Sequence, residues 1–181
     1  MITIPIDEQT IIDATIYVDK SKIGKRRSFN GNRTNQVVGM TGEFIIADLL
    51  GFERPKRKDG FDGGWDIQIG QKLIDIKTVG RTSNARLDYD SNVIEAQMHF
   101  KATHFLFCSL NKTKRLFTIV GFISKEDFKA KSKFYKKGDE YTRVNGDKMI
   151  LNASGYFIKN EELIQVDSIA ELKDLLIFKN E

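Results

Sequence analysis

The chain has 181 residues, of which 40% are hydrophobic, and its 29 Lys and Arg side chains against 25 Asp and Glu give a formal net charge of +4. This length is enough for one compact domain with a hydrophobic core and short for two, so we expect a single domain over residues 1–181. No run approaches the roughly 20 apolar residues that cross a bilayer. The first residues also lack a basic signal region, so we expect no membrane span and a cytoplasmic protein.

The first third of the chain is predicted to hold two helices separated by a basic loop. Residues 7–20 have the pattern of a short helix, and residues 21–35 are rich in glycine, asparagine and basic side chains. Residues 36–50 are almost continuously apolar and are followed by Gly51. This is typical of a mostly buried helix with a glycine at its C′ position.

Strands and helices are mixed in the rest of the chain. We expect strands at residues 65–69, 72–79, 103–110 and 115–123. We expect helices at residues 91–100, 124–134 and 168–178. Each of the last two helices begins with a capping box. The order predicts an α/β fold with a mixed sheet. We divide it into an N-terminal helix and basic loop (1–34), a catalytic core (35–123), and C-terminal helices and closing segments (124–181).

The segment GWDIQIGQKLIDIK, residues 64–77, is predicted to be a β-hairpin. The Gly70-Gln71 pair suits a two-residue type II′ turn, which prefers glycine at its first central position. Residue numbers of cross-strand partners then sum to 141, whereas a three-residue loop would shift the register and mix the two faces. Alternation gives one apolar face, made of Trp65, Ile67, Ile74 and Ile76. The opposite face carries Asp66, Gln68, Leu73, Asp75 and Lys77.

Two acidic side chains of this hairpin are predicted to face each other. Asp66 and Asp75 would lie about 5 Å apart, and at an effective dielectric constant near 20 their repulsion would be on the order of 3 kcal/mol. Lys77 would offset part of this repulsion, and a bound Mg²⁺ would remove it through hard oxygen ligands. The alternative is a solvated face on which the acids and the lysine pair with one another.

Glu43 lies in the apolar stripe of the helix predicted over residues 36–50, where an unpaired carboxylate is costly to bury. Its neighbours Gly39 and Gly42 each weaken the helix by roughly 1 kcal/mol relative to alanine. That cost is tolerable if the glycines let backbone or a ligand come close. Glu43 therefore needs a partner; the alternative is a glycine-mediated helix contact, with Glu43 reaching solvent at an edge.

The sequence GMTGE on a helix, then WDI at the start of a strand and IDIK on its neighbour, resembles the PD-(D/E)XK nucleases of the restriction-endonuclease-like fold. The residues that correspond to the family's catalytic set are Glu43, Asp66, Asp75 and Lys77. Trp65 stands where proline is often found. The segments ITIPIDEQTIIDA, FTIVGFISKEDFKAKSKFYKKGD and YFIKNEELIQV are similar to small phage-type members, so the resemblance extends over most of the chain.

This resemblance implies a mixed β-sheet flanked by helices in αβββαβ order, and Mg²⁺-dependent hydrolysis of phosphodiester bonds, with Mn²⁺ as a substitute. Asp66 and Asp75 would hold the metal, with the carbonyl oxygen of Ile76 as a further ligand. Lys77 would orient the attacking water or stabilise transition-state charge. Glu43 would be a direct ligand, the holder of a second metal, or act through water. We therefore expect a DNA endonuclease; the alternatives are a Holliday-junction-resolving nuclease and a catalytically silent DNA-binding protein of the same fold.

Other polar residues have weaker signals. Gln97 could hydrogen-bond near the site or be a surface residue, and Glu95 is equally open. Asp59 and Asp62 are spare acids or turn residues in a glycine-rich loop, and Asp62 is the substitute for Asp66. The residues for which we expect an ordinary structural role are His99 and His104, which have no partner at zinc spacing, and Cys108, a buried reduced thiol.

Three basic stretches, at residues 20–27, 54–58 and 129–137, are predicted to contact the phosphates of duplex or branched DNA. The alternative for each stretch is a solvated charged loop. The residues that we predict to bind nucleic acid are Lys25, Arg26, Arg27, Arg33, Lys56, Arg57 and Lys58. A homodimer is compatible with this interpretation, and a phage-encoded protein would act in the cytoplasm of a bacterial host.

Overall fold

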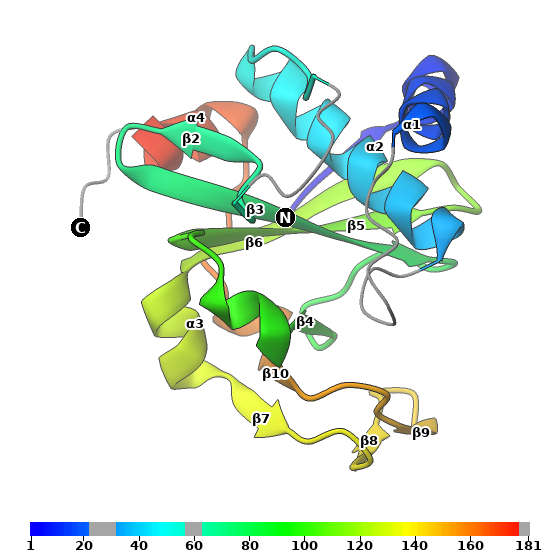
Figure 1. Ribbon diagram of the computed structural model, residues 1–181, viewed down its shortest axis with the longest axis vertical. Coiled ribbons are helices and arrows are strands. Elements are labelled where there is room, and N and C mark those ends of the chain that lie inside the picture. The colour runs from blue at the N-terminus through cyan, green and yellow to red at the C-terminus, as the bar shows by residue number, and fades with distance from the viewer. Residues whose placement is uncertain (22–31, 57–62, 178–181) are drawn as a thin grey trace.

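The computed structural model describes residues 1–21, 32–56 and 63–177, and in this part of the chain a central mixed β-sheet is flanked by helices (Figure 1). The protein is therefore mixed α/β, as the sequence predicts. The α-helices of the described residues are α1 Glu8–Lys20, α2 Arg33–Leu50, α3 Lys125–Lys131 and α4 Ile169–Ile177. None of these described helices is both long enough and apolar enough to span a bilayer.

The central sheet has five strands in the order β1-β6-β5-β3-β2. Their bounds are β1 Ile2–Pro5, β2 Ile67–Ile69, β3 Lys72–Arg81, β5 His104–Asn111 and β6 Leu116–Ser124. Strands β3 and β5 are parallel, and the other neighbours are antiparallel. A parallel pair needs a crossover connection, which here contains β4 (Asp90–Ile94) and the 3₁₀ helix η1 (Glu95–His99) in place of an α-helix.

The side chains of β3 alternate between two differently covered faces of the sheet. Ile74 and Ile76 belong to the core that contains apolar side chains of α2 and α4, and we call this side the α2 face. Asp75 is the register partner of Phe105, which packs on Phe128 of α3 in a second core, and we call that side the α3 face. Figure 1 shows α1 and α2 on one side of the sheet, and α3 with β4 and β10 (Gly155–Lys159) on the other.

Helix α2 contacts β3 closely because its sequence provides a glycine at the contact. A Cβ atom on Gly42 would lie 1.9 Å from the Oγ1 of Thr78, so only glycine fits there without movement. A Cβ on Gly39 would meet nothing within 4 Å. The prediction that the α2 glycines permit a close approach is therefore confirmed for Gly42, and the approaching group is strand β3.

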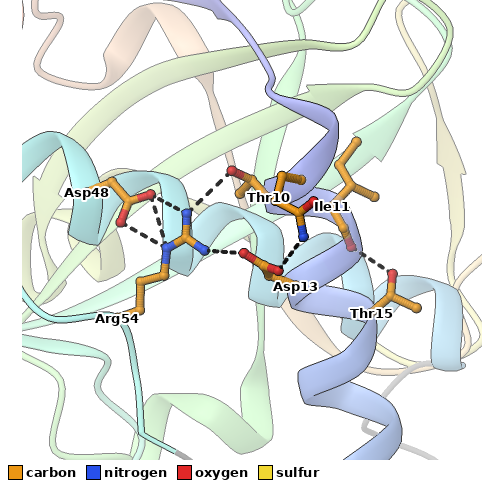
Figure 2. Close-up of polar contacts among 7 residues, drawn as sticks. Thr10, Ile11, Asp13, Thr15, Asp48 and Arg54 are labelled. Carbon is orange, nitrogen blue, oxygen red and sulfur yellow. Dashed lines mark hydrogen bonds and ion pairs between the residues drawn. The ribbon is translucent and has the colours of Figure 1, made fainter.

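Arg54, in the segment after α2, ties α2 to α1 (Figure 2). Its guanidinium donates to Asp48 of α2 at 2.6 Å and to Asp13 of α1 at 2.8 Å, and lies over the ring of Phe44 at 5.0 Å. The hydrogen bond from Gln9 lowers the pKa of Asp13, burial opposes that effect, and Arg54 lowers the pKa further. This residue of the 54–58 basic stretch thus has a structural role.

A smaller antiparallel sheet lies below the α3 face, and the connection between two of its strands forms a projecting hairpin (Figure 1). The small sheet has the order β4-β10-β7, and the hairpin pairs β8 with β9. Their remaining bounds are β7 Lys133–Tyr135, β8 Glu140–Thr142, β9 Lys148–Ile150 and β10 Gly155–Lys159, with the 3₁₀ helix η2 at Asn160–Glu162. The sequence predicts none of these strands.

Local signals fix several helix ends. Gly51 ends α2 in the left-handed conformation, with φ 80°, and Ser124 begins α3 by accepting a hydrogen bond from the Asp127 N–H. Ser168 caps α4 in the same way. These three predictions are confirmed.

The helix predicted over residues 91–100 is wrong in its first half. Residues Asp90–Ile94 form a strand paired with β10, and helical turns of 3₁₀ type cover only Glu95–His99. Within this strand Ser91 and Val93 are buried in an alternating pattern. Pairing with a segment more than 60 residues further along the chain overrides the local helical preference.

Candidate functional site

The hairpin that carries the acidic pair has the predicted register. Ile67 pairs with Ile74 and Ile69 with Lys72, so partner numbers sum to 141. A type II′ turn requires a positive φ at its first central residue only. Gly70 has φ 57°, and Gln71 does not have a positive φ, so both residues fit this turn type. The buried side chains Ile67, Ile74 and Ile76 share the α2 face, which confirms the predicted apolar face in its centre.

The ladder ends one residue before the predicted acidic pair. Strand β2 begins at Ile67, and Asp66 donates its N–H to Ile74 O at 2.8 Å while its Oδ2 accepts the Ile76 N–H at 2.7 Å. The Asp66 carboxylate therefore lies at the edge of β3, and the expected direct pairing of Asp66 with Asp75 across the ladder is wrong. Trp65, expected on the apolar α2 face, instead packs against the core of the α3 face.

Asp75 and Lys77 form a close ion pair on the α3 face. The Lys77 Nζ lies 2.6 Å from Asp75 Oδ2, and their side chains are only 20% and 8% exposed. Residues two apart on a strand share a face, which is why the Asp-x-Lys spacing brings them together. Removing one partner of such a pair is costly, because the other charge then stays buried.

A second cation, Lys125 in the first turn of α3, interacts electrostatically with Asp75. Burial lowers the pKa of Lys125, the negative charge of Asp75 opposes this, and Lys129 lowers the pKa further. The Lys125 Nζ donates to Phe100 O at 2.6 Å. Sequence reasoning missed Lys125. Helix α3 follows β6, and β6 comes near Asp75 of β3 only because both strands pair with β5, which the sequence does not indicate.

Oxygen atoms of the kind that Mg²⁺ prefers gather around Ile76. The Asp66 carboxylate contacts the Ile76 N–H, and Asp75 is the preceding residue. The carbonyl of a strand residue points to the same strand edge as its N–H, so Ile76 O also faces the edge beside Asp66. Two carboxylates and a carbonyl fit the hard-donor chemistry of Mg²⁺.

Glu43 is half-buried on α2, the helix that covers the α2 face, whereas Asp75 and Lys77 lie on the α3 face. Over residues 1–21, 32–56 and 63–177, no group of three or more His, Cys, Asp and Glu side chains is placed to hold a metal ion. Glu43, Asp66 and Asp75 thus form no such group here. The role of Glu43 in a metal site stays a prediction.

Two of the predicted nucleic-acid-binding residues are paired with acids of this chain. Arg33 binds Asp19 at 2.6 Å, and Lys56 binds Glu53 at 2.7 Å. Five other residues predicted to bind nucleic acid lie outside the described parts of the chain: Lys25, Arg26, Arg27, Arg57 and Lys58. The spare acids Asp59 and Asp62 lie outside them as well.

The remaining polar residues lie near the start of β5. Gln97 is in η1, and Glu95 and His99 line a cleft of about 480 Å³ together with Lys125. His104 stacks on Phe122 at 5.0 Å, which agrees with its expected structural role. Cys108 is a buried free thiol, as expected, and burial raises its pKa.

Comparisons of the chain with protein-family models, curated proteins and solved structures found no match. The chemistry of the Asp66, Asp75 and Lys77 cluster, together with the resemblance of its motif, therefore carries the functional proposal.

Proposed function

We propose that the protein is a Mg²⁺-dependent DNA endonuclease with a restriction-endonuclease-like core. The observation that carries the proposal is the clustering around Ile76: Asp66 on its N–H at 2.7 Å, and an Asp75–Lys77 contact of 2.6 Å. An Asp-x-Lys pair beside a second acid is the arrangement that the resemblance implies.

The order of elements around the cluster supports the finer fold. Helix α2 precedes the β2–β3 hairpin, and β5 then returns parallel to β3. An αβββαβ core likewise has a helix, then antiparallel strands, then a strand that returns parallel. The crossover before β5 differs from the expected order, because it contains β4 and η1 where an α-helix is expected.

The residues of the cluster have separable roles in this proposal. Asp66, Asp75 and the Ile76 carbonyl would hold Mg²⁺, which supplies Lewis-acid activation of the phosphate and lowers the pKa of a bound water. Lys77, paired with Asp75, is placed to stabilise negative charge on the phosphate in the transition state. Lys125 adds a second positive charge near Asp75.

The test is nicking of supercoiled plasmid with Mg²⁺, with Mn²⁺, and with EDTA. Asp75→Asn keeps the size of the side chain and removes its charge, and Lys77→Met keeps most of its length. We expect each to reduce nicking by at least about 100-fold, the order of magnitude lost with a transition-state-stabilising group. Asp174→Asn, an exposed acid on α4 remote in sequence from the cluster, is the matched control and should cleave normally.

Circular dichroism separates lost chemistry from lost folding in each variant. Undiminished nicking by a folded Asp75→Asn variant would contradict the proposal. Binding of DNA without cleavage under any metal would favour the catalytically silent alternative. Preference for a four-way junction over linear duplex would assign the junction-resolving alternative.

A further inference from the structure

A cleft of about 560 Å³ opens at the carboxyl end of β3, next to the β8–β9 hairpin. Its lining includes Val79 and Arg81 of β3, and Tyr141 and Arg143 from the hairpin. Lys112, in the turn between β5 and β6, completes a set of basic residues around it. The proposed catalytic chemistry uses none of these residues.

The cleft continues the same face of β3 that carries Asp75 and Lys77. Side chains alternate along a strand, so Lys77, Val79 and Arg81 point to one side. Val79, the cleft residue of β3 that is nearest in sequence to the ion pair, is 41% exposed, so the strand is open to solvent there. At about 3.3 Å per residue, Arg81 lies roughly 13 Å beyond Lys77.

The charges of the cleft are unbalanced. Its lining has three cations, Arg81, Lys112 and Arg143, and one carboxylate, Asp90, so 3 − 1 leaves a net charge of +2. The carboxylate of Asp90 is itself engaged, because it accepts the Tyr141 hydroxyl and lies 3.1 Å from the Lys159 Nζ. Asp90 is therefore a poor counterion for the arginines.

Arg81 is held in place by a backbone oxygen and an aromatic ring. Its guanidinium donates to the backbone oxygen of Asp90 at 3.2 Å and lies over the ring of Tyr89 at 4.9 Å. Among the residues that the structure describes, no carboxylate forms an ion pair with it. Burial is the main cause that lowers the pKa of Arg81, and Arg143 lowers it further. The negative charge of an anion in the cleft would offset both effects, because it favours the charged guanidinium.

We propose that this cleft binds backbone phosphates of the DNA strand that passes the Asp75–Lys77 site. The proposal rests on the proposed nuclease function and adds the path of the substrate. Because each DNA strand carries one phosphate per nucleotide, a strand with a phosphate at Lys77 would present further phosphates along the same face of β3. The planar forks of the arginines in the cleft suit phosphate oxygens.

The experiment measures binding of a fluorescein-labelled 20-base-pair duplex by anisotropy, in EDTA, over a range of salt concentrations. Arg143→Gln and Lys112→Gln alter exposed residues and are made singly and together. Each lost phosphate contact should reduce the slope of log K against log salt by about 0.9, which at 0.15 M salt is about fivefold in affinity. The double variant should lose about 30-fold on the same basis.

Lys148→Gln is the matched control, since it removes one charge from the same hairpin but does not line the cleft. It should leave the salt slope unchanged. An unchanged slope in the double variant would overturn the proposal, as would a wild-type chain that does not bind DNA. The binding assay contains no metal and needs no cleavage. Its outcome is therefore independent of the plasmid-nicking assay with Asp75→Asn, and that nicking assay is the one that tests the proposed function.

Discussion

Gly42→Ala should destabilise the protein, whereas Gly39→Ala on the same helix should stabilise it. A methyl group at position 42 would lie 1.9 Å from Thr78 Oγ1 and 2.8 Å from Thr78 Cβ. Rotation of the Thr78 side chain relieves the first contact only, because the Cβ is fixed by the β3 backbone. Helix α2 would then have to move away from the sheet.

The size of the effect follows from two opposing contributions. Overpacking of a core costs about 1–3 kcal/mol, and alanine in place of a helical glycine returns roughly 1 kcal/mol. For a clash against backbone-anchored atoms we expect a net loss of about 2 kcal/mol in Gly42→Ala. Gly39→Ala meets no atom within 4 Å, so it should gain up to about 1 kcal/mol. The two variants should therefore differ by about 3 kcal/mol.

Urea denaturation followed by far-UV circular dichroism measures both free energies of unfolding. Thr78→Ala combined with Gly42→Ala should recover part of the loss, since it removes the atom at 1.9 Å. Equal stability of Gly42→Ala and Gly39→Ala would refute the reasoning, because it would mean that α2 does not rest on β3 at Gly42.

Two further predictions concern charges. Arg54→Met should cost about 1 kcal/mol at pH 7, because the contacts of Arg54 with Asp48 and Asp13 are lost. The pKa of Asp13 is lowered in the folded state, first by the hydrogen bond from Gln9 and also by Arg54. The share that Arg54 contributes through Asp13 is therefore present above the ordinary value of 3.8 and is lost as the pH falls through the lower folded value. Urea denaturation of wild type and variant should therefore give free energies that converge in acid, and a difference that grows there would contradict the assignment. Lys77→Met should lose about 3 kcal/mol because the buried Asp75 carboxylate loses the cation that it contacts at 2.6 Å. Lys77→Met combined with Asp75→Asn should regain most of that loss in the same measurement, and a double variant no more stable than Lys77→Met would argue against a buried ion pair.

The two proposed functional regions lie on one strand. The ion pair of Asp75 and Lys77 is near the middle of β3, and Arg81 is at its end. A rigid strand inside a sheet fixes the distance between them more firmly than a loop would. If both proposals hold, β3 determines the chemistry and also where the substrate backbone is held.

The candidate site could be predicted as far as short-range geometry reaches. The Asp-x-Lys contact follows from the two-residue period of a strand, and the hairpin register follows from Gly70 and Gln71. The position of Asp66 could not be read in this way. Its carboxylate accepts the Ile76 N–H at the point where the ladder ends, and a residue pattern does not indicate where pairing stops.

The sequence by itself determined the features that depend on atoms a few residues apart: the II′ turn, the glycine end of α2, the serine caps of α3 and α4, and the Asp75–Lys77 pair. Turns, caps and side-chain alternation are set by local backbone geometry, so local patterns suffice to predict them.

Only the tertiary structure decided which distant segments meet. It placed β4 against β10, brought Lys125 within electrostatic range of Asp75, and put Arg143 and Arg81 in the lining of one cleft. It also put Glu43 on the helix that covers the opposite face of β3 from Asp75. These outcomes depend on long-range strand pairing and on burial in shared cores, whose free energy is a property of both partners together and is not encoded in either segment alone.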